Sequence, residues 1–309
     1  MGINFYSISC GKLDRRYLPN TLAGIPKTIY GFIESNNLIK KIKPDIVVSF
    51  GGYVSVPVIF ISFLKRIKTI THEQTLTNSL TTKINSHFVT KIALSFNNQK
   101  QISQLPQNKV VITGNLLRHQ LFEKENLIPQ EIKNKFGQKN KNPIIYITAG
   151  NQGSHAINLI IKKILPKLTT FNVIHQTGKN DIDLFSNLSQ KYQNYYAADY
   201  FDTNTFSWII HHTDIVISRS GANTSQEIVA LNKKSILIPL PKSQQNEQDL
   251  NAQWVKDHLP KCTIIINNDQ LNEKLLLDSI NQLSKVKTKK ELPLNNQNLK
   301  LLNLIHEII

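Results

Sequence analysis

Short, β-branched apolar runs alternate with longer stretches of helical spacing along most of the chain. Strands that alternate with helices are typical of βαβ units, in which helices cover both faces of a parallel sheet. The 309 residues are enough for two such domains. The strand-like runs are residues 46–50, 68–71, 110–112, 144–148, 172–175, 215–218 and 235–238.

Two polar, Lys- and Asn-rich segments interrupt this alternation, at about residues 119–141 and 285–298. After the second, apolar residues recur at helical spacing (Leu299, Leu302, Ile305, Ile309), which predicts a final amphipathic helix. The predicted organisation is a first domain over 1–120, a linker over 121–141, a second domain over 142–284, and a linker with a helix that packs back on the first domain over 285–309.

Charge and cysteine content narrow the functional classes. The formal net charge of +16 favours polyanionic partners such as nucleic acid, anionic lipid headgroups or phosphorylated substrates. Dispersed basic residues without an aromatic platform argue against nucleic acid. Cys10 and Cys262 show neither a zinc spacing nor a disulfide pattern. No apolar run approaches the roughly 18 residues that span a bilayer, so any membrane contact should be peripheral.

The turn after the strand at 215–218 has the chemistry of an anion site. Gly221 allows close backbone approach, and the N–H groups of Ala222, Asn223 and Thr224 would open the next helix with the positive end of its dipole. Thr224 adds a hydroxyl donor. Glu227 has two interpretations at this stage: an acceptor for a ribose diol, or a first-turn complement to the helix dipole.

A second glycine-rich turn follows the strand at 144–148. Its residues Gly150, Asn151, Gln152 and Gly153 predict a second anion-binding loop, although this motif alone is not specific for such a site. His175 ends the next strand. A histidine at such a position is more often a hydrogen-bonded core residue than a functional one, and we expect the former.

Seven motifs in one order resemble the MurG family of glycosyltransferases. They are "GGYVS" (51–55), "HEQ" (72–74), "GNLLR" (114–118), "GNQGS" (150–154), "HQTGK" (175–179), "SRSGANTSQEI" (218–228) and "EQDLNA" (247–252). The resemblance implies an α/β fold of the GT-B type, with two doubly wound Rossmann-like domains facing a cleft. It also implies transfer of GlcNAc from UDP-GlcNAc to undecaprenyl-diphosphate-MurNAc-pentapeptide, with inversion, in peptidoglycan synthesis.

The resemblance assigns residues to the donor. Gly221–Thr224 would hold the UDP diphosphate, Glu227 the ribose hydroxyls, and the backbone of Phe201 the uracil. Arg118 would lie on the donor side, and Gln248 would read the sugar hydroxyls. The full donor set is Arg118, Asn151, Gln152, Gly153, Phe201, Ser220, Gly221, Ala222, Asn223, Thr224, Glu227 and Gln248.

The acceptor set implied by the resemblance is Gly51, Gly52, Tyr53, His72, Glu73 and Thr75. Thr75 replaces a family Asn, Asn151 a family Ser, and Glu247 a Gln or His. The family's opening strand and "GGTGGH"-like loop have no counterpart before "GINFYSISC". Because the family's candidate for catalytic work lies in that loop, we expect residues 1–309 alone to bind the donor but to transfer poorly, and no catalytic base is assigned.

A lipid-linked acceptor requires contact with a membrane. Ile25, Ile29, Phe32 and Ile33 share one face of a predicted helix with lysines nearby, which is either a core-facing stripe or an interfacial patch for anionic lipid. The expected location is the cytoplasmic side of the bacterial inner membrane. No cofactor or metal is expected. Two alternatives stay open: another GT-B glycolipid glycosyltransferase, or a split UDP-sugar-binding subunit.

Overall fold

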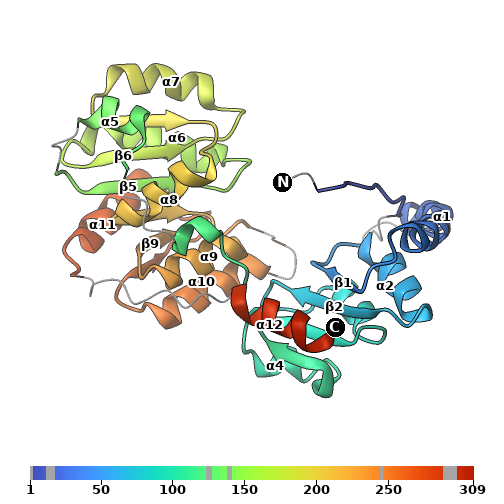
Figure 1. The fold of residues 1–309 in the computed structure, drawn as a ribbon. Coiled ribbons are helices and arrows are strands. Elements are labelled where there is room, and N and C mark those ends of the chain that lie inside the picture. Colours follow the sequence, from blue (N-terminus) through green and yellow to red (C-terminus); the bar gives the residue numbers. More distant parts are fainter. Residues whose placement is uncertain are drawn as a thin grey trace. The chain divides into compact units, whose positions relative to one another are not determined.

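The computed structural model describes residues 3–11, 18–122, 127–137, 141–241, 243, 246–287 and 298–309, with side chains from residue 24 onward in the first helix. The chain divides into two compact units (Figure 1). The first comprises Met1–Leu116 together with Gln297–Ile309, and the second comprises Leu117–Asn296. Each is described separately below.

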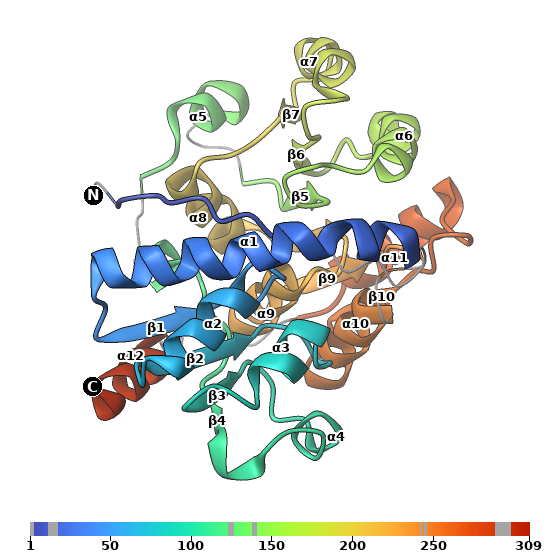
Figure 2. The same ribbon diagram turned by 90° about the vertical axis from the view of Figure 1, so that its right-hand side faces the viewer.

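The first unit is built on a four-stranded parallel sheet in the order β1-β2-β3-β4. Its elements are α1 (Leu18–Ile42), β1 (Ile46–Ser49), α2 (Ser55–Leu64), β2 (Lys68–Glu73), α3 (Leu80–Asn85), β3 (Lys91–Leu94), α4 (Gln99–Ile102), β4 (Val110–Ile112) and α12 (Asn298–Ile308). Helices α1 and α2 lie side by side (Figure 2).

Alternating residues of the first sheet supply two apolar faces, because successive side chains of a strand point to opposite sides. Ile92 and Leu94 of β3 pack with Ile59 of α2 on one face. Ala93 of β3 and Ile70 of β2 pack on the other face with α12. The C-terminal helix therefore belongs to the core of the first unit, although it is separated from it by the whole second unit in sequence.

The second unit has a six-stranded parallel sheet in the order β10-β9-β8-β5-β6-β7. Its strands are β5 (Ile144–Thr148), β6 (Asn172–Gln176), β7 (Tyr195–Ala198), β8 (Ile215–Ser218), β9 (Lys234–Leu237) and β10 (Thr263–Ile265). Its helices are α5 (Gln130–Phe136), α6 (His155–Ile164), α7 (Ile182–Lys191), α8 (Thr203–His212), α9 (Ala222–Ala230), α10 (Glu247–His258) and α11 (Glu273–Ser284).

Two cores cover the two faces of the second sheet, which makes this unit doubly wound. Ile145 and Ile147 of β5 face the core formed with α6, α7 and α11. Tyr146, between them, faces the core formed with α5, α8, α9 and α10. The expectation of two parallel-sheet α/β domains is confirmed.

Strand order reverses at β5. The chain adds β6 and β7 on one side of β5, then returns to add β8, β9 and β10 on the other. Thr148 at the end of β5 pairs with Ser218 at the end of β8. The loops that leave these two strands diverge at the carboxyl edge of the sheet, which is where open α/β sheets bind ligands.

Several sequence-based boundaries were wrong. β2 runs on through His72 and Glu73, and β3, β7 and β10 were missed. Of the expected linker 121–141, residues 123–126 and 138–140 lie outside the described residues, but Leu121 and Ile132 are buried in the second unit's core. Residues 288–297 of the expected second linker also lie outside the described part.

The buried face of α12 differs from the one that the apolar spacing suggested. Leu301 and Leu304 are buried, whereas Leu299, Leu302 and Ile309 are exposed. The helix is apolar on more than one side, so spacing alone did not identify the side that faces the sheet. None of the described helices has the length and apolar character needed to cross a membrane.

Leu304→Ala should lower the free energy of unfolding by about 2–4 kcal/mol, because it removes a buried side chain between α12 and the first sheet. Leu302→Ala, on the same helix but 49% exposed, is the matched control and should change stability by less than about 0.5 kcal/mol. Urea titration followed by far-UV circular dichroism measures both. Both tryptophans, Trp208 and Trp254, lie in the second unit and report on it separately. Equal stabilities of the two variants would contradict this placement of α12.

Candidate functional site

The amino end of α9 is open. Gly221 is its N-cap residue, with φ −64° and ψ 154°, and a glycine has no side chain that could cap the helix. The first backbone N–H groups of a helix have no partner within the helix, and they carry the positive end of its dipole. An uncapped N-terminus after β8, at the point where strand order reverses, is suited to an anion.

Glycine at position 221 is not explained by the protein's own packing. Its φ is one that any residue adopts, and a Cβ atom added there would meet no atom of the described residues within 4 Å. Gly150, in the loop after β5, also has open space at the Cβ position, although its φ of +76° favours glycine by itself. Space kept beside the backbone at Gly221 is what a bound ligand needs.

Two other glycines hold the first loop against its neighbour. A Cβ atom on Gly153 would lie 1.9 Å from the carbonyl oxygen of Thr177, and one on Gly178 would lie 2.4 Å from the carbonyl oxygen of Gln152. The loop after β5 and the loop after β6 therefore pack backbone to backbone. Asn151 and Gln152 are exposed at the tip of the first loop.

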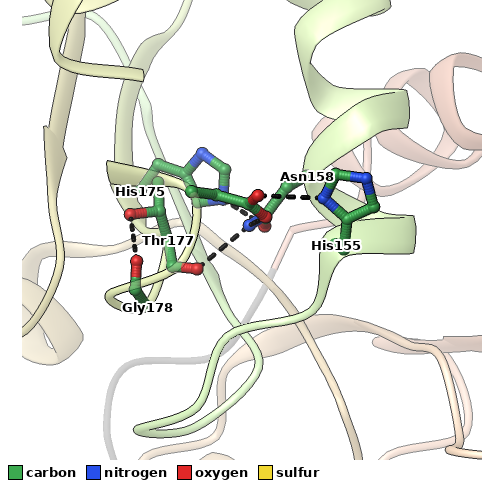
Figure 3. A network of polar contacts seen from close by, with 6 residues as sticks. His155, Asn158, His175, Thr177 and Gly178 are labelled. Atoms are coloured by element: carbon green, nitrogen blue, oxygen red, sulfur yellow. Dashed lines mark hydrogen bonds and ion pairs between the residues drawn. The ribbon is translucent and has the colours of Figure 1, made fainter. Parts of the chain in front are cut away.

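A polar network, buried at Asn158 and His175 and exposed at His155, ties these loops to α6 (Figure 3). Asn158 donates from Nδ2 to the carbonyl oxygen of Thr177 (3.0 Å) and to Oδ2 of Asp181 (2.7 Å). Asp181 Oδ1 lies 2.9 Å from Nδ1 of His155. Both carboxylate oxygens of Asp181 therefore serve this network.

His175 is a core histidine, as expected, and the network determines which of its ring nitrogens carries the proton. Because Asn158 uses its Nδ2 group elsewhere, its Oδ1 accepts from His175 Nε2 (3.0 Å). His175 Nδ1 then accepts from the Tyr195 hydroxyl (2.8 Å). Burial lowers the pKa of His175 to about 3, so the ring is neutral at ordinary pH.

Glu227 lies beyond the first turn of α9, facing inward. Its side chain is 5% exposed, and its Oε1 lies 3.6 Å from Nε of Arg118. The Arg118 guanidinium also stacks over the ring of Phe206, 4.1 Å from the centroid. Burial raises the pKa of Glu227 to about 7, against the lowering effect of the Arg118 charge. The interpretation of Glu227 as a first-turn dipole complement is wrong, because α9 has no acidic residue in that turn.

Helix α10 holds the loop before α9. The Ser220 hydroxyl donates to the carbonyl oxygen of Gln248 (2.7 Å), and Asn251 Nδ2 donates to the carbonyl oxygen of Ser220 (3.0 Å). Gln248 Oε1 accepts from the backbone N–H of Leu240 (2.9 Å), which directs its Nε2 group, a donor, away from that contact. The Phe201 ring is buried against Tyr146 and Tyr196, so only its backbone could serve a ligand.

The second unit thus brings the expected donor residues onto the loops and helices at the carboxyl edge of its own sheet. Ala222, Asn223 and Thr224 form the first turn of α9, and Asn223 is exposed. Arg219, Asn158 and Asn251 were missed as residues that shape this edge. Arg219 and Asn251 lie inside quoted motifs and Asn158 lies four residues after one, but their long-range partners are not visible in the sequence.

The expected acceptor residues all belong to the first unit. Gly51 and Gly52 have φ of +85° and +77° with open space at their Cβ positions, and Tyr53 is 42% exposed. Glu73 accepts from the backbone N–H groups of Thr75 and Ser79, so both its oxygens serve its own loop. The Thr75 hydroxyl is likewise engaged, with Glu73 and the Thr77 carbonyl.

His72 is buried and lies 3.0 Å through Nε2 from the carbonyl oxygen of Gly114. Burial lowers its pKa, so the neutral ring donates from Nε2 and carries its lone pair on Nδ1. That nitrogen is buried and has no hydrogen-bond partner within the described ranges.

Two family models match the chain. The glycosyltransferase family 28 C-terminal domain matches residues 144–307, and the family 28 N-terminal domain matches residues 1–94. The UDP-N-acetylglucosamine--N-acetylmuramyl-(pentapeptide) pyrophosphoryl-undecaprenol N-acetylglucosamine transferase of Clostridium botulinum (strain 657 / Type Ba4) is 34% identical over 284 residues, which are 91% of this chain and 77% of that protein. The protein of the same description from Lachnospira eligens is 33% identical over 92% of this chain and 77% of its own length.

Solved structures show the same fold. Acinetobacter baumannii MurG superposes with a TM-score of 0.63 at 20% identity, covering 90% of this chain and 79% of its own. The UDP-GlcNAc 2-epimerase from Neisseria meningitidis, bound to UDP-GlcNAc, superposes with a TM-score of 0.61 at 15% identity, covering 95% and 82%.

His175→Gln should reduce the acid sensitivity of the fold. A histidine in an unfolded chain has a pKa of about 6.5. Below that pH the unfolded state binds a proton, whereas the buried ring of His175 in the folded state stays neutral. Stability present above about pH 6.5 is therefore lost as the pH falls toward 3. Between pH 7 and pH 5 we expect the parent protein to lose about 2 kcal/mol more than the variant. Urea titrations at both pH values measure this, and identical losses would show that His175 does not carry the effect.

Proposed function

Because the chain belongs to glycosyltransferase family 28, and within it to the MurG enzymes, we infer that it transfers GlcNAc from UDP-GlcNAc to undecaprenyl-diphosphate-MurNAc-pentapeptide. The reaction converts lipid I into lipid II in peptidoglycan synthesis. The observation that carries this inference is 34% identity over 91% of the chain to a transferase named for that reaction. The open N-terminus of α9 and the buried Glu227 supply a physical basis for the donor half.

We propose that the diphosphate of UDP lies at the first turn of α9, beside Gly221. Backbone N–H groups of Ala222, Asn223 and Thr224 would donate to phosphate oxygens there, with the favourable dipole of the helix. The loop of Asn151, Gln152 and Gly153 would complete the cradle, and it leaves β5, which pairs with β8. Open space at Gly221 supports this placement.

The nucleoside and sugar would use the remaining donor residues. Ionised Glu227 would accept hydrogen bonds from the ribose hydroxyls, with Arg118 offsetting its charge at 3.6 Å. Gln248 would donate from Nε2 to a sugar hydroxyl, since its Oε1 is engaged with Leu240. The backbone of Phe201 would meet the uracil.

The chemistry is a direct displacement at the anomeric carbon. The O4 hydroxyl of MurNAc forms the new bond to C1 of GlcNAc and loses its proton to a base, while the C1–O bond to UDP breaks with inversion. Negative charge grows on the leaving diphosphate, and the helix N-terminus would stabilise that charge. Alignment of the acceptor hydroxyl with C1 would contribute further to the rate enhancement.

On the acceptor side, the exposed loop of Gly51, Gly52 and Tyr53 is our proposed contact surface. Glu73 and Thr75 would act by shaping the loop after β2, because their oxygens are engaged within it. His72 would lie next to the acceptor loop, because the centroid of its ring is 5.8 Å from that of Phe50, the residue before Gly51.

We further propose that α1 meets the cytoplasmic face of the membrane peripherally. Ile25, Ile29 and Ile33 recur every four residues and are 47%, 58% and 53% exposed. Lys27 and Lys40 on the same helix are also exposed, which suits anionic headgroups. Phe32, assigned to this patch from the sequence, instead packs edge to face on Phe60 of α2, so the patch excludes it.

Glu227→Gln should weaken binding of both UDP and uridine by about 1–3 kcal/mol, because the ribose loses a charged acceptor. Transfer of radiolabelled GlcNAc to a lipid I analogue by the same variant should fall at subsaturating donor. Glu131→Gln, the same change at an exposed site of the same unit, is the control. Calorimetry and product radiochromatography measure the two effects. Unchanged uridine affinity would remove Glu227 from the ribose site, and use of a different lipid-linked acceptor would overturn the proposed reaction.

Ile29→Glu should reduce co-sedimentation with vesicles that contain anionic lipid, because it places a charge in the proposed patch. Asn108→Glu adds the same charge at an exposed position of the first unit outside α1 and should have a much smaller effect. UDP affinity should be unchanged in both variants, since both positions belong to the first unit. Equal sedimentation of the two variants would count against the patch.

A further inference from the structure

Arg219 joins three segments at the carboxyl edge of the second sheet. It follows β8 directly and precedes the open N-terminus of α9. Its Nη1 donates to the carbonyl oxygens of Ile238 and Pro239, both at 3.0 Å, and its Nη2 donates to the hydroxyl of Ser154 at 2.9 Å. The loops after β5, β8 and β9 are therefore linked through one guanidinium.

The charge of Arg219 has no counter-charge in the described part of the chain. The residue is 8% exposed, and all of its hydrogen-bond acceptors are neutral. Its Nε is buried without a partner among the described residues. The buried carboxylate of Glu227 is already paired with Arg118. A buried charge ordinarily has an ion partner, so this arrangement is costly until an anion comes near.

The contact with Ser154 has a second consequence. Ser154 is the N-cap residue of α6, yet its side chain caps no N–H group of that helix and accepts from Arg219 instead. Elsewhere in the same unit, Asp202 and Asn272 cap α8 and α11 through their side chains, whereas the N-cap residues of α5, α7 and α10 make no side-chain cap. The two helices that follow the loops joined by Arg219, α6 and α9, thus both keep uncapped amino ends.

We propose that Arg219 is a positioning residue that supplies a fixed positive charge to the donor's diphosphate from behind the loop. It holds the loops after β5, β8 and β9 together, and its uncompensated charge favours the diphosphate over an uncharged ligand. This inference rests on the proposed donor site. The same charge would stabilise the leaving UDP, because a buried charge already in place needs no reorganisation as the bond breaks.

The guanidinium fork suits both tasks. Two of its nitrogens reach three acceptors on two neighbouring loops, which a single ammonium cannot match in geometry. Arg219→Lys therefore separates the tasks, since it keeps the charge and loses the fork. Ser154→Ala keeps the arginine and removes one acceptor.

The test compares the affinities of UDP and uridine by calorimetry, because only UDP carries the diphosphate. We expect Arg219→Gln to weaken UDP binding at least tenfold and uridine binding less than twofold, and to flatten the dependence of UDP affinity on salt. Arg219→Lys and Ser154→Ala should keep the ratio of the two affinities within about threefold of the parent protein. Circular dichroism at the same temperature checks that each variant is folded.

Equal losses of UDP and uridine binding in Arg219→Gln would show a purely structural role, and unchanged binding of both would remove Arg219 from the site. If the glutamine variant does not fold, Arg219→Lys decides: a UDP-to-uridine ratio that falls tenfold despite the retained charge would overturn the proposal. A parent protein that binds neither ligand would overturn the donor site itself, which is a different result from any of these.

Discussion

The pairing of β5 with β8 is the constraint on which the proposed donor site depends. Because Thr148 lies beside Ser218 in a parallel ladder, the two strands end together, and their loops leave from adjacent points of the same edge. The strand order reverses there, so the helices that follow turn to opposite faces of the sheet. The amino ends of α6 and α9 therefore flank a common point without a helix crossing between them.

Three charged side chains define the electrostatics around that point. Arg219, three residues before α9, and Glu227, beyond the first turn of that helix, are both buried and are of opposite charge type. Glu227 has its counter-charge in Arg118, which lies next to the junction with the first unit and stacks on Phe206. Arg219 has only neutral acceptors among the described residues. A ligand with an anionic diphosphate and a neutral ribose diol matches this pair, phosphate toward the cation and hydroxyls toward the carboxylate.

Much of the fold could be predicted because it is recorded in local patterns. Strands β4, β5 and β8 are rich in β-branched residues, and their bounds were predicted correctly. The missed strands carry weaker signals: β7 is "YYAA", β10 has three residues, and β3 begins with a lysine. Ile132 looked like part of a linker because its neighbours are polar, but it is buried and, with the partly buried Phe136, packs α5 on the core. Phe32 and Ile33 are adjacent on a helix and face different surroundings, which only packing against Phe60 reveals.

The sequence by itself determined the fold class, the family and the loops that carry the site, since these depend on apolar periodicity, glycine turns and ordered motifs that are local in the chain. Only the tertiary structure decided which side chains act on those loops. Arg219 and Ser154 are 65 residues apart, and His175 and Asn158 are 17 apart. The motifs identify such residues one at a time, whereas their partnership follows from strand order and register. The state of each group also follows from burial: a neutral His175, a Glu227 with a raised pKa and an Arg219 without a counter-charge result from the loss of water around them, which no local pattern encodes.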